Sequence, residues 1–287
     1  MISGVFIIRN GTKLGYPYIE SLRSLLPLCD EVVCGIGGSD DDTRERIASL
    51  NEPKIRIVDT VWDMANRSGG TVLSRETNRV LKECRGEWVV YLQADEVFSD
   101  KDYTHIRTAI ERANNNQSID GLYFKYLHFY GSYFTIQTGR NWYRQEVRII
   151  RNHRGIVSHG DAQGFRKDGA KIIAAPSDAR VFHYGWARPP EMMREKIKSF
   201  HRFWHDDDWI EKNCADKKAS EFFGDLGNVT SYDGDHPAVM KGRITRDGVN
   251  FIRECRAAYL RSRGVKRLLK DMVRLLPFCG HRNFKKI

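Results

Sequence analysis

Glu87-Trp88-Val89-Val90-Tyr91-Leu92-Gln93-Ala94-Asp95-Glu96-Val97-Phe98 is the segment of this 287-residue chain from which its fold can be inferred. Trp88 to Leu92 form a run of apolar, β-branched and aromatic residues, which is the pattern of a central strand buried on both faces. Two adjacent carboxylates, Asp95 and Glu96, follow where that strand should end. In open α/β sheets ligands gather outside the carboxyl ends of the strands, so this acidic tip is the first candidate site.

The segment before this strand is typical of a helix that packs on the sheet. Leu73, Val80, Leu81 and Cys84 give it an apolar side, and the sequence predicts Ser74 as its N-cap. Paired carboxylates after a strand supply the oxygen ligands that Mg²⁺ or Mn²⁺ prefers. The alternative is a solvated loop in which Asp95 caps the next turn.

The residues before this helix alternate strands with helices. Apolar runs at residues 4–8, 30–36 and 54–58 predict three strands, and the intervals at 18–26 and 44–50 predict two helices. This alternation indicates right-handed crossovers and a mostly parallel sheet. The first strand is followed by neither a G-x-G-x-x-G fingerprint nor a P-loop, which argues against a dinucleotide or P-loop nucleotide site.

Composition restricts the class of protein further. The hydrophobic content of 41% supports a sizeable core, and the formal net charge of +10 predicts an anionic partner. The six cysteines form no CxxC pair and read as reduced, buried side chains of a cytosolic protein. We expect no signal peptide and no transmembrane helix, because no apolar run is long enough.

Taken together and in order, these segments resemble a family 2 glycosyltransferase with the GT-A fold. The likeness covers residues 1–100 and includes Thr77-Asn78, Gly86-Glu87-Trp88 and the loop Gly38-Ser39-Asp40-Asp41-Asp42-Thr43. That loop usually reads D-x-G-S-x-D-x-T in the family, and here Ile36 replaces its first Asp. Gln93-Ala94-Asp95 likewise keeps only the last Asp of the D-x-D motif, and Glu96 completes a Gln-Ala-Asp-Glu variant.

The resemblance implies an α/β fold with a mostly parallel sheet flanked by helices, a nucleotide-sugar donor and a divalent metal, Mn²⁺ or Mg²⁺. It makes Asp95 a metal ligand, and His183 resembles the His that many GT-A enzymes add to the metal, although a lone His in an aromatic stretch is more often a core residue. The donor-binding residues that it implies are Asn10, Asp41, Asn78, Gln93, Ala94 and Arg188.

Beyond residue 118 the sequence becomes rich in aromatic residues. Residues 121–131 and 142–150 predict antiparallel strands, whose aromatic side chains either stack on sugar rings or simply fill the core. Family 2 enzymes use a later carboxylate as general base on the acceptor hydroxyl, and Asp161 fits that place. The alternative role for Asp161 is capping a turn, and His159 is a lesser candidate for the base.

The sequence suggests a catalytic domain at residues 1–190, with a nucleotide-binding half at 1–100 and an acceptor-side half at 118–190. We expect residues 191–287 to form a helical, basic extension. From Val249 leucines interleave with Arg and Lys, a pattern that suits either an anionic membrane surface or packing on the catalytic domain. The protein would then be cytoplasmic, either free or peripheral on the inner face of the cytoplasmic membrane.

The expected function is inverting, metal-assisted transfer of a sugar from a nucleotide-diphosphate donor to a hydroxyl of a glycan or lipid-linked acceptor. A sugar nucleotidyltransferase of related fold is one alternative, although Arg9-Asn10-Gly11-Thr12-Lys13 is a poor version of its basic loop. A basic nucleic-acid-binding protein is another, but no reader motif is present, so nucleic acid is not an expected partner. The departures at Ile36 and Gln93 also allow a non-catalytic family member.

Overall fold

A computed structural model describes residues 1–65, 68–214, 228–248 and 282–287 of the chain. Its first half contains β1 (Ile2–Ile8), α1 (Tyr18–Leu25), β2 (Glu31–Gly37), α2 (Thr43–Ala48), β3 (Ile55–Thr60), α3 (Thr71–Leu81), β4 (Trp88–Leu92), β5 (Glu96–Phe98) and α4 (Tyr103–Asn114). The remainder contains β6 (Gly121–Tyr130), β7 (Thr135–Gln137), β8 (Gln145–Arg151), β9 (Ile156–His159), β10 (Gly164–Lys167), β11 (Ala170–Lys171), β12 (Ile173–Trp186), α5 (Pro190–His201), α6 (Asp207–Cys214), β13 (Val229–Ser231), α7 (Lys241–Asp247) and β14 (Lys285–Lys286).

The main sheet has a parallel half and a mixed half that meet at β4. Strands β3, β2, β1 and β4 are parallel neighbours in that order, and β8 then pairs antiparallel with β4. Strand β6 is antiparallel to β8, and β12 is parallel to β6. Strands β12 and β4 therefore run in the same direction, which brings their carboxyl ends to the same edge of the sheet.

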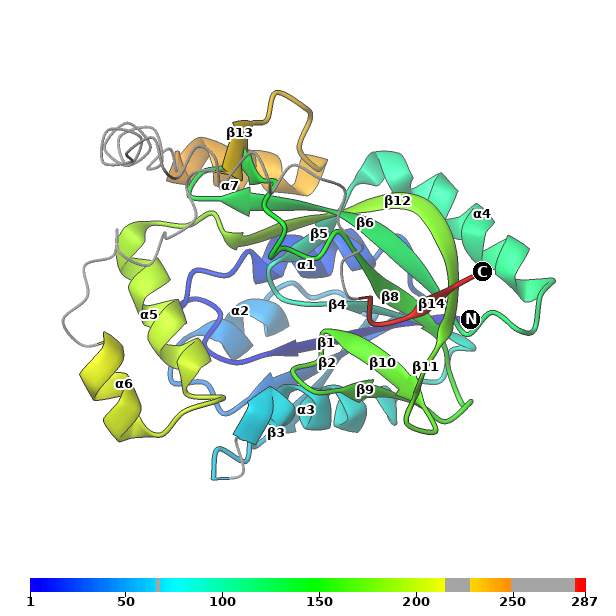
Figure 1. The fold of residues 1–287 in the computed structure, drawn as a ribbon, viewed down its shortest axis with the longest axis horizontal. Coiled ribbons are helices and arrows are strands. Elements are labelled where there is room, and N and C mark those ends of the chain that lie inside the picture. The colour runs from blue at the N-terminus through cyan, green and yellow to red at the C-terminus, as the bar shows by residue number, and fades with distance from the viewer. Residues whose placement is uncertain (66–67, 215–227, 249–281) are drawn as a thin grey trace.

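Two layers of helices cover the sheet because the side chains of its central strands alternate between two cores. Trp88, Val90 and Leu92 pack with residues of α1 and α4, whereas Val89 and Tyr91 pack with α3 and the small sheet β9–β10–β11. Figure 1 shows α4 above the sheet, α3 below it, and α5 and α6 at the end opposite to the two termini. The predicted α/β fold is confirmed.

The strand predicted at residues 88–92 is confirmed at those bounds, and the expected extension starts with a helix, α5, which begins at Pro190. The predicted cap of α3 is wrong. The helix begins at Thr71 after Gly70, and Ser74 lies inside it, where its hydroxyl donates to the carbonyl oxygen of Gly160 at 2.7 Å. The Ser74 side chain thus ties α3 to the turn after β9 instead of starting the helix.

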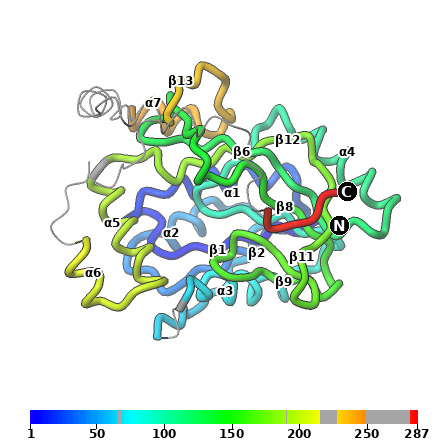
Figure 2. Tube along the Cα trace, viewed as in Figure 1, coloured from blue at the N-terminus to red at the C-terminus, as the bar shows by residue number. Residues whose placement is uncertain are grey.

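The part of the chain expected to be a helical extension also contributes strands. Strand β13 pairs with β7, and β14 pairs with β12 beside Ile173 and Ala174. Figure 2 shows this last segment in red along the same end of the molecule as the N-terminus. The predicted amphipathic helix from Val249 lies outside the described residues, and the domain boundary at residue 190 stays a prediction.

The cysteines of the described residues, Cys29, Cys34, Cys84 and Cys214, are free and buried. No helix within the described part of the chain is long and apolar enough to cross a bilayer.

Candidate active site

A cavity of about 460 Å³ lies where the carboxyl ends of β1 and β4 face α5 and the turn before β10. Three of the predicted donor-binding residues line it, Asn10, Gln93 and Ala94, together with both predicted metal ligands, Asp95 and His183. Asp161, the predicted general base, lines the same cavity. The structure therefore brings most of the residues predicted from the sequence to the edge where an open α/β sheet binds ligands.

Asp95 sits at this edge because two strands hold its backbone. It lies three residues after the end of β4 and immediately before β5, and its carbonyl oxygen accepts a hydrogen bond of 2.8 Å from the amide of Tyr184 in β12. Glu96, the next residue, pairs in register with His183. Asp95 as a whole residue is only 6% exposed, so neighbouring groups must compensate its charge.

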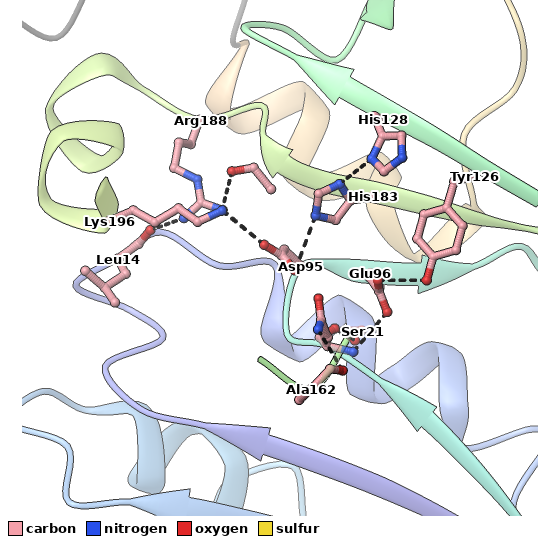
Figure 3. Close-up of polar contacts among 12 residues, drawn as sticks. Leu14, Ser21, Asp95, Glu96, Tyr126, His128, Ala162, His183, Arg188 and Lys196 are labelled. Atoms are coloured by element: carbon pink, nitrogen blue, oxygen red, sulfur yellow. Dashed lines mark hydrogen bonds and ion pairs between the residues drawn. The ribbon is translucent and has the colours of Figure 1, made fainter. Parts of the chain in front are cut away.

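The two oxygens of Asp95 have different neighbours. Oδ2 lies 3.2 Å from Lys196 Nζ and 3.9 Å from Arg188 Nη2, whereas Oδ1 lies 3.7 Å from His183 Nε2 (Figure 3). Burial alone would raise the pKa of Asp95, but the charges of Lys196, His183 and Arg188 lower it well below its usual range. Asp95 is therefore ionised, and its ionised form is fixed in place.

Arg188 and Lys196 supply more positive charge than Asp95 balances. Arg188 is fully enclosed, donates to the carbonyl oxygen of Leu14 and lies 4.6 Å from the centre of the Tyr16 ring. Lys196 donates to the carbonyl oxygen of Gly185 at 2.7 Å and lines the cavity. Burial, followed by the like charge of Arg188, lowers the pKa of Lys196 to about 8. Two cations thus share one carboxylate beside the cavity.

A chain of hydrogen bonds fixes the orientation of His183. His128 Nε2 lies 2.6 Å from the carbonyl oxygen of Tyr143 and must therefore carry the proton, which leaves Nδ1 of neutral His128 as an acceptor. His183 Nδ1, at 2.8 Å from His128 Nδ1, is then the donor. Burial lowers the pKa of His183 to about 4 and that of His128 to about 3, so both rings are neutral at pH 7.

This assignment leaves the Nε2 lone pair of His183 on the side of Asp95 Oδ1. An imidazole nitrogen and a carboxylate oxygen at 3.7 Å can both reach one divalent cation, because each binds such ions at roughly 2.0–2.2 Å. The residues present therefore fit the metal that the GT-A fold implies, although within the described residues no group of three or more His, Cys, Asp and Glu side chains forms a metal cluster.

Glu96 does not join Asp95 at a cation site, in contrast to the initial expectation for this pair of carboxylates. It is fully buried and accepts two hydrogen bonds from Arg148, from Nε at 2.7 Å and from Nη2 at 2.8 Å. The hydroxyl of Tyr126 donates to it as well, at 2.9 Å (Figure 3). Glu96 is thus a structural partner of Arg148, and successive side chains of the chain point in opposite directions here.

The remaining predicted donor residues differ in position. Asn10 lines the cavity and adopts a positive φ of 55°, and its side chain accepts from the amide of Asp40 at 2.9 Å. Asp41 accepts from the amide of Lys13 at 2.8 Å and so joins two loops outside the cavity lining. Asn78 also lies outside it, because its side-chain amide is held on both sides by the backbone of Ser158. The structure does not bring Asp41 or Asn78 to Asp95.

Asp161 occupies the turn between β9 and β10, and its Oδ1 accepts from the amide of Gln163 at 3.4 Å. This is the turn-capping geometry of the alternative interpretation, but one hydrogen bond leaves further acceptor capacity on the carboxylate. The His159 side chain is exposed and does not line the cavity.

Two residues that matter here escaped the sequence analysis. Lys196 is one of several basic residues on an amphipathic helix, and only the packing of α5 distinguishes it from its neighbours. His128 lies in an aromatic strand, and its relation to His183 follows from the pairing of β6 with β12, in which these two residues are in register. Neither the packing of α5 nor the pairing of β6 with β12 can be predicted from local sequence.

The fold and the cavity at its carboxyl edge are those of a GT-A type glycosyltransferase. The family model described as glycosyl transferase family 2 matches residues 16–172, which is more than half of the chain. The chain therefore belongs to glycosyl transferase family 2, and the resemblance noted in the sequence is confirmed at the level of the family. No curated protein matches the chain.

Solved structures give weaker likenesses. TarS from S. aureus, residues 1–349 in complex with UDP-GlcNAc, is 19% identical over 45% of this chain and 34% of its own, with a TM-score of 0.33. The same fragment without ligand is 13% identical over 77% of this chain and 67% of its own, with a TM-score of 0.38.

Glucosyl-3-phosphoglycerate synthase from Mycobacterium tuberculosis, in complex with Mn²⁺, UDP and phosphoglyceric acid, is 21% identical over 45% of this chain and 43% of its own, with a TM-score of 0.30. The chain thus spans about a third of the length of the first of these structures. At these TM-scores the family match alone carries the assignment.

Proposed function

We propose that this protein transfers a sugar, with inversion, from a nucleotide-diphosphate donor to a hydroxyl of a glycan or lipid-linked acceptor. The observation that carries the proposal is the excess of fixed positive charge around the buried carboxylate of Asp95. Arg188 and Lys196 lie within 3.9 Å of that single anion, at the edge of the sheet where family 2 enzymes hold the donor. A diphosphate supplies the negative charge that this arrangement lacks.

Residues of this chain can act on both the leaving group and the acceptor hydroxyl. The acceptor oxygen forms a bond to the anomeric carbon while the bond from that carbon to the diphosphate breaks, and its electron pair leaves with the nucleoside diphosphate. Lys196 is placed to stabilise the charge on this leaving group, and Arg188 holds the loop at Leu14 against Asp95. Asp161 takes the proton of the acceptor hydroxyl as general base.

Asp95 and His183 would hold the divalent metal, Mn²⁺ or Mg²⁺, which when bound offsets charge on the diphosphate. Gln93, Ala94 and Asn10 line the cavity and are the donor contacts that we retain. Asp41 and Asn78 enter the proposal as residues that fix the loops around the cavity.

The test is the thermal stability of the whole chain against UDP, GDP, ADP and CDP, each with and without Mn²⁺. A diphosphate at a hundred times its Kd adds about 2.7 kcal/mol to the free energy of unfolding. We expect one of these nucleotides to give this shift in the wild type and little of it in Asp95→Asn. Asp40→Asn is the matched control, because that carboxylate is exposed and lies outside the cavity.

Asp161→Asn separates donor binding from transfer. It should keep the nucleotide-induced shift and lower kcat by roughly 10²–10⁴-fold, the usual contribution of a general base. The absence of any nucleotide effect on the wild type, with or without metal, would contradict the proposed function.

A further inference from the structure

A second, larger cavity of about 930 Å³ opens beside the first. Its walls come from β6, the loop between β7 and β8, the start of β8 and the returning segment at residues 282–286. Trp142, Tyr143 and Gln163 line both cavities, so the two share a wall. The second cavity is the place from which a second substrate can approach the first.

The charges that line this cavity are almost all positive: Lys125, Arg140, Arg144, Arg282 and Lys286, against the single carboxylate of Glu146. Within the described residues, Lys125, Arg144, Arg282 and Lys286 form no ion pair. Burial, with repulsion from Arg282 and Lys125, lowers the pKa of Lys286. Like charges therefore converge on this cavity with only the carboxylate of Glu146 to oppose them, which favours an anionic ligand.

Glu146 gives the cavity a second kind of recognition. Its side chain is only 1% exposed, and its Oε1 accepts a hydrogen bond of 3.0 Å from Asn283 Nδ2. Its other oxygen, Oε2, is buried and has no hydrogen-bond partner among the residues that the structure describes. Because buried polar atoms normally have a partner, this oxygen indicates a place for a ligand donor such as a hydroxyl group.

The shared wall has the chemistry of a carbohydrate site. Trp142 and Tyr143 are half-buried aromatic side chains, and the apolar face of a sugar ring packs on such surfaces. Gln163 adds an amide at the same wall, next to the turn that carries Asp161. A sugar that rests on this wall would have its reacting hydroxyl near the predicted general base.

We propose that the second cavity is the acceptor subsite and that it takes a phosphate-bearing sugar. The phosphate lies among the arginines, whose guanidinium groups bind phosphate in a bidentate manner, and the lysines, whose ammonium groups add positive charge. A hydroxyl of the sugar donates to Glu146. This inference rests on the proposed function, because it names the class of the second substrate. It requires nothing of the residues outside the described part of the chain.

Isothermal titration of the whole chain tests this inference, with glucose 6-phosphate, glucose and inorganic phosphate as probes, each with and without saturating UDP and Mn²⁺. We expect glucose 6-phosphate to bind in the presence of UDP and at least tenfold more tightly than either glucose or phosphate. Arg144→Glu and Lys125→Glu should each weaken it by tenfold or more. Arg23→Glu, an exposed arginine on α1, is the matched control and should leave the affinity unchanged.

The outcomes distinguish this inference from the proposed function. If UDP binds and glucose 6-phosphate does not, or if the two compete, the acceptor subsite is wrong and the donor site stands. If inorganic phosphate binds as tightly as the sugar phosphate, the site recognises phosphate alone. The proposal that it recognises a sugar would then be wrong. If the Arg144→Glu and Lys125→Glu variants bind glucose 6-phosphate like the wild type, the ligand lies elsewhere.

Discussion

The two cavities differ in how their charges are balanced. Around the first, Asp95 and Arg188 are enclosed, and Asp95 is in direct contact with the charges of Lys196 and Arg188. Around the second, cations such as Arg144 and Lys286 are exposed and have no acidic partner among the described residues. Water can solvate an exposed cation but cannot reach a buried one, so burial decides which charges must be paired.

This contrast in burial and pairing indicates that the two sites have different tasks. A buried set of charges held in direct contact with one another fixes the geometry of the groups around a reacting bond. An open set of like charges attracts an anion and leaves its exact position to the aromatic wall. Arg148 and Glu96 lie behind this wall, because Arg148 also donates to the carbonyl oxygen of Gln163 at 3.0 Å.

The largest effect that we expect comes from breaking this buried pair. Arg148→Met leaves the carboxylate of Glu96 enclosed and without its cation, which should lower the free energy of unfolding by about 3–5 kcal/mol. Arg144→Met, four residues earlier and exposed, is the matched control and should change it by less than about 0.5 kcal/mol. Urea titration measures both. Equal losses in the two variants would contradict the comparison.

Glu146 should make stability depend on pH, because it is the acidic exception at the second cavity. Burial raises its pKa from 4.5 to about 7, against the opposing effects of Arg148 and Asn283. Between these two pH values the folded state binds more protons than the unfolded state, so stability falls as pH rises through this window. The loss should reach about 3 kcal/mol by pH 7 and then level off.

Glu146→Gln removes this titration, so the difference in free energy of unfolding between wild type and variant isolates the effect of this carboxyl. Urea titrations at pH 4, 5, 6, 7 and 8 measure it. A difference that does not change across this range would show that Glu146 ionises freely in the folded protein.

The smallest of the three expected effects tests whether His128 orients His183 for metal binding at the first cavity. His128→Phe removes the acceptor that holds the Nδ1 proton of His183, and loss of such an outer partner typically weakens metal binding by roughly 10–100-fold. Titration of Mn²⁺, with free Mn²⁺ measured by electron paramagnetic resonance, gives the affinity directly. His105→Phe, an exposed histidine on α4, is the control, and equal affinities would refute the role of His128.

Local sequence predicted the elements whose patterns are strong. The run Trp88 to Leu92 is apolar on both faces, so it can only be a central strand, and Asp95 and Asn10 follow from the rule that ligands gather at carboxyl ends. The cap of α3 was wrong, because Gly70 with a φ of 71° precedes the helix and a tertiary contact to Gly160 engages Ser74 instead.

What local sequence could not predict depends on pairing between distant strands. Glu96 looked like a partner of Asp95, but Arg148, fifty-two positions away, takes both of its oxygens because β4 and β8 are neighbours. Likewise the second cavity requires the return of residues 282–286 to β12. A sequence shows that these residues are charged, but only the fold decides which of them meet.

Tyr143 links the two cavities through the hydrogen bond that its carbonyl oxygen accepts. Tyr143 belongs to the shared wall, and its carbonyl oxygen fixes the proton of His128 and through it the lone pair of His183. Two hydrogen bonds of 2.6 and 2.8 Å therefore separate the place where a second substrate would rest from the nitrogen that would bind a metal. If occupancy of one side shifts Tyr143, the affinities of the two sides must change by the same factor, since such coupling is reciprocal.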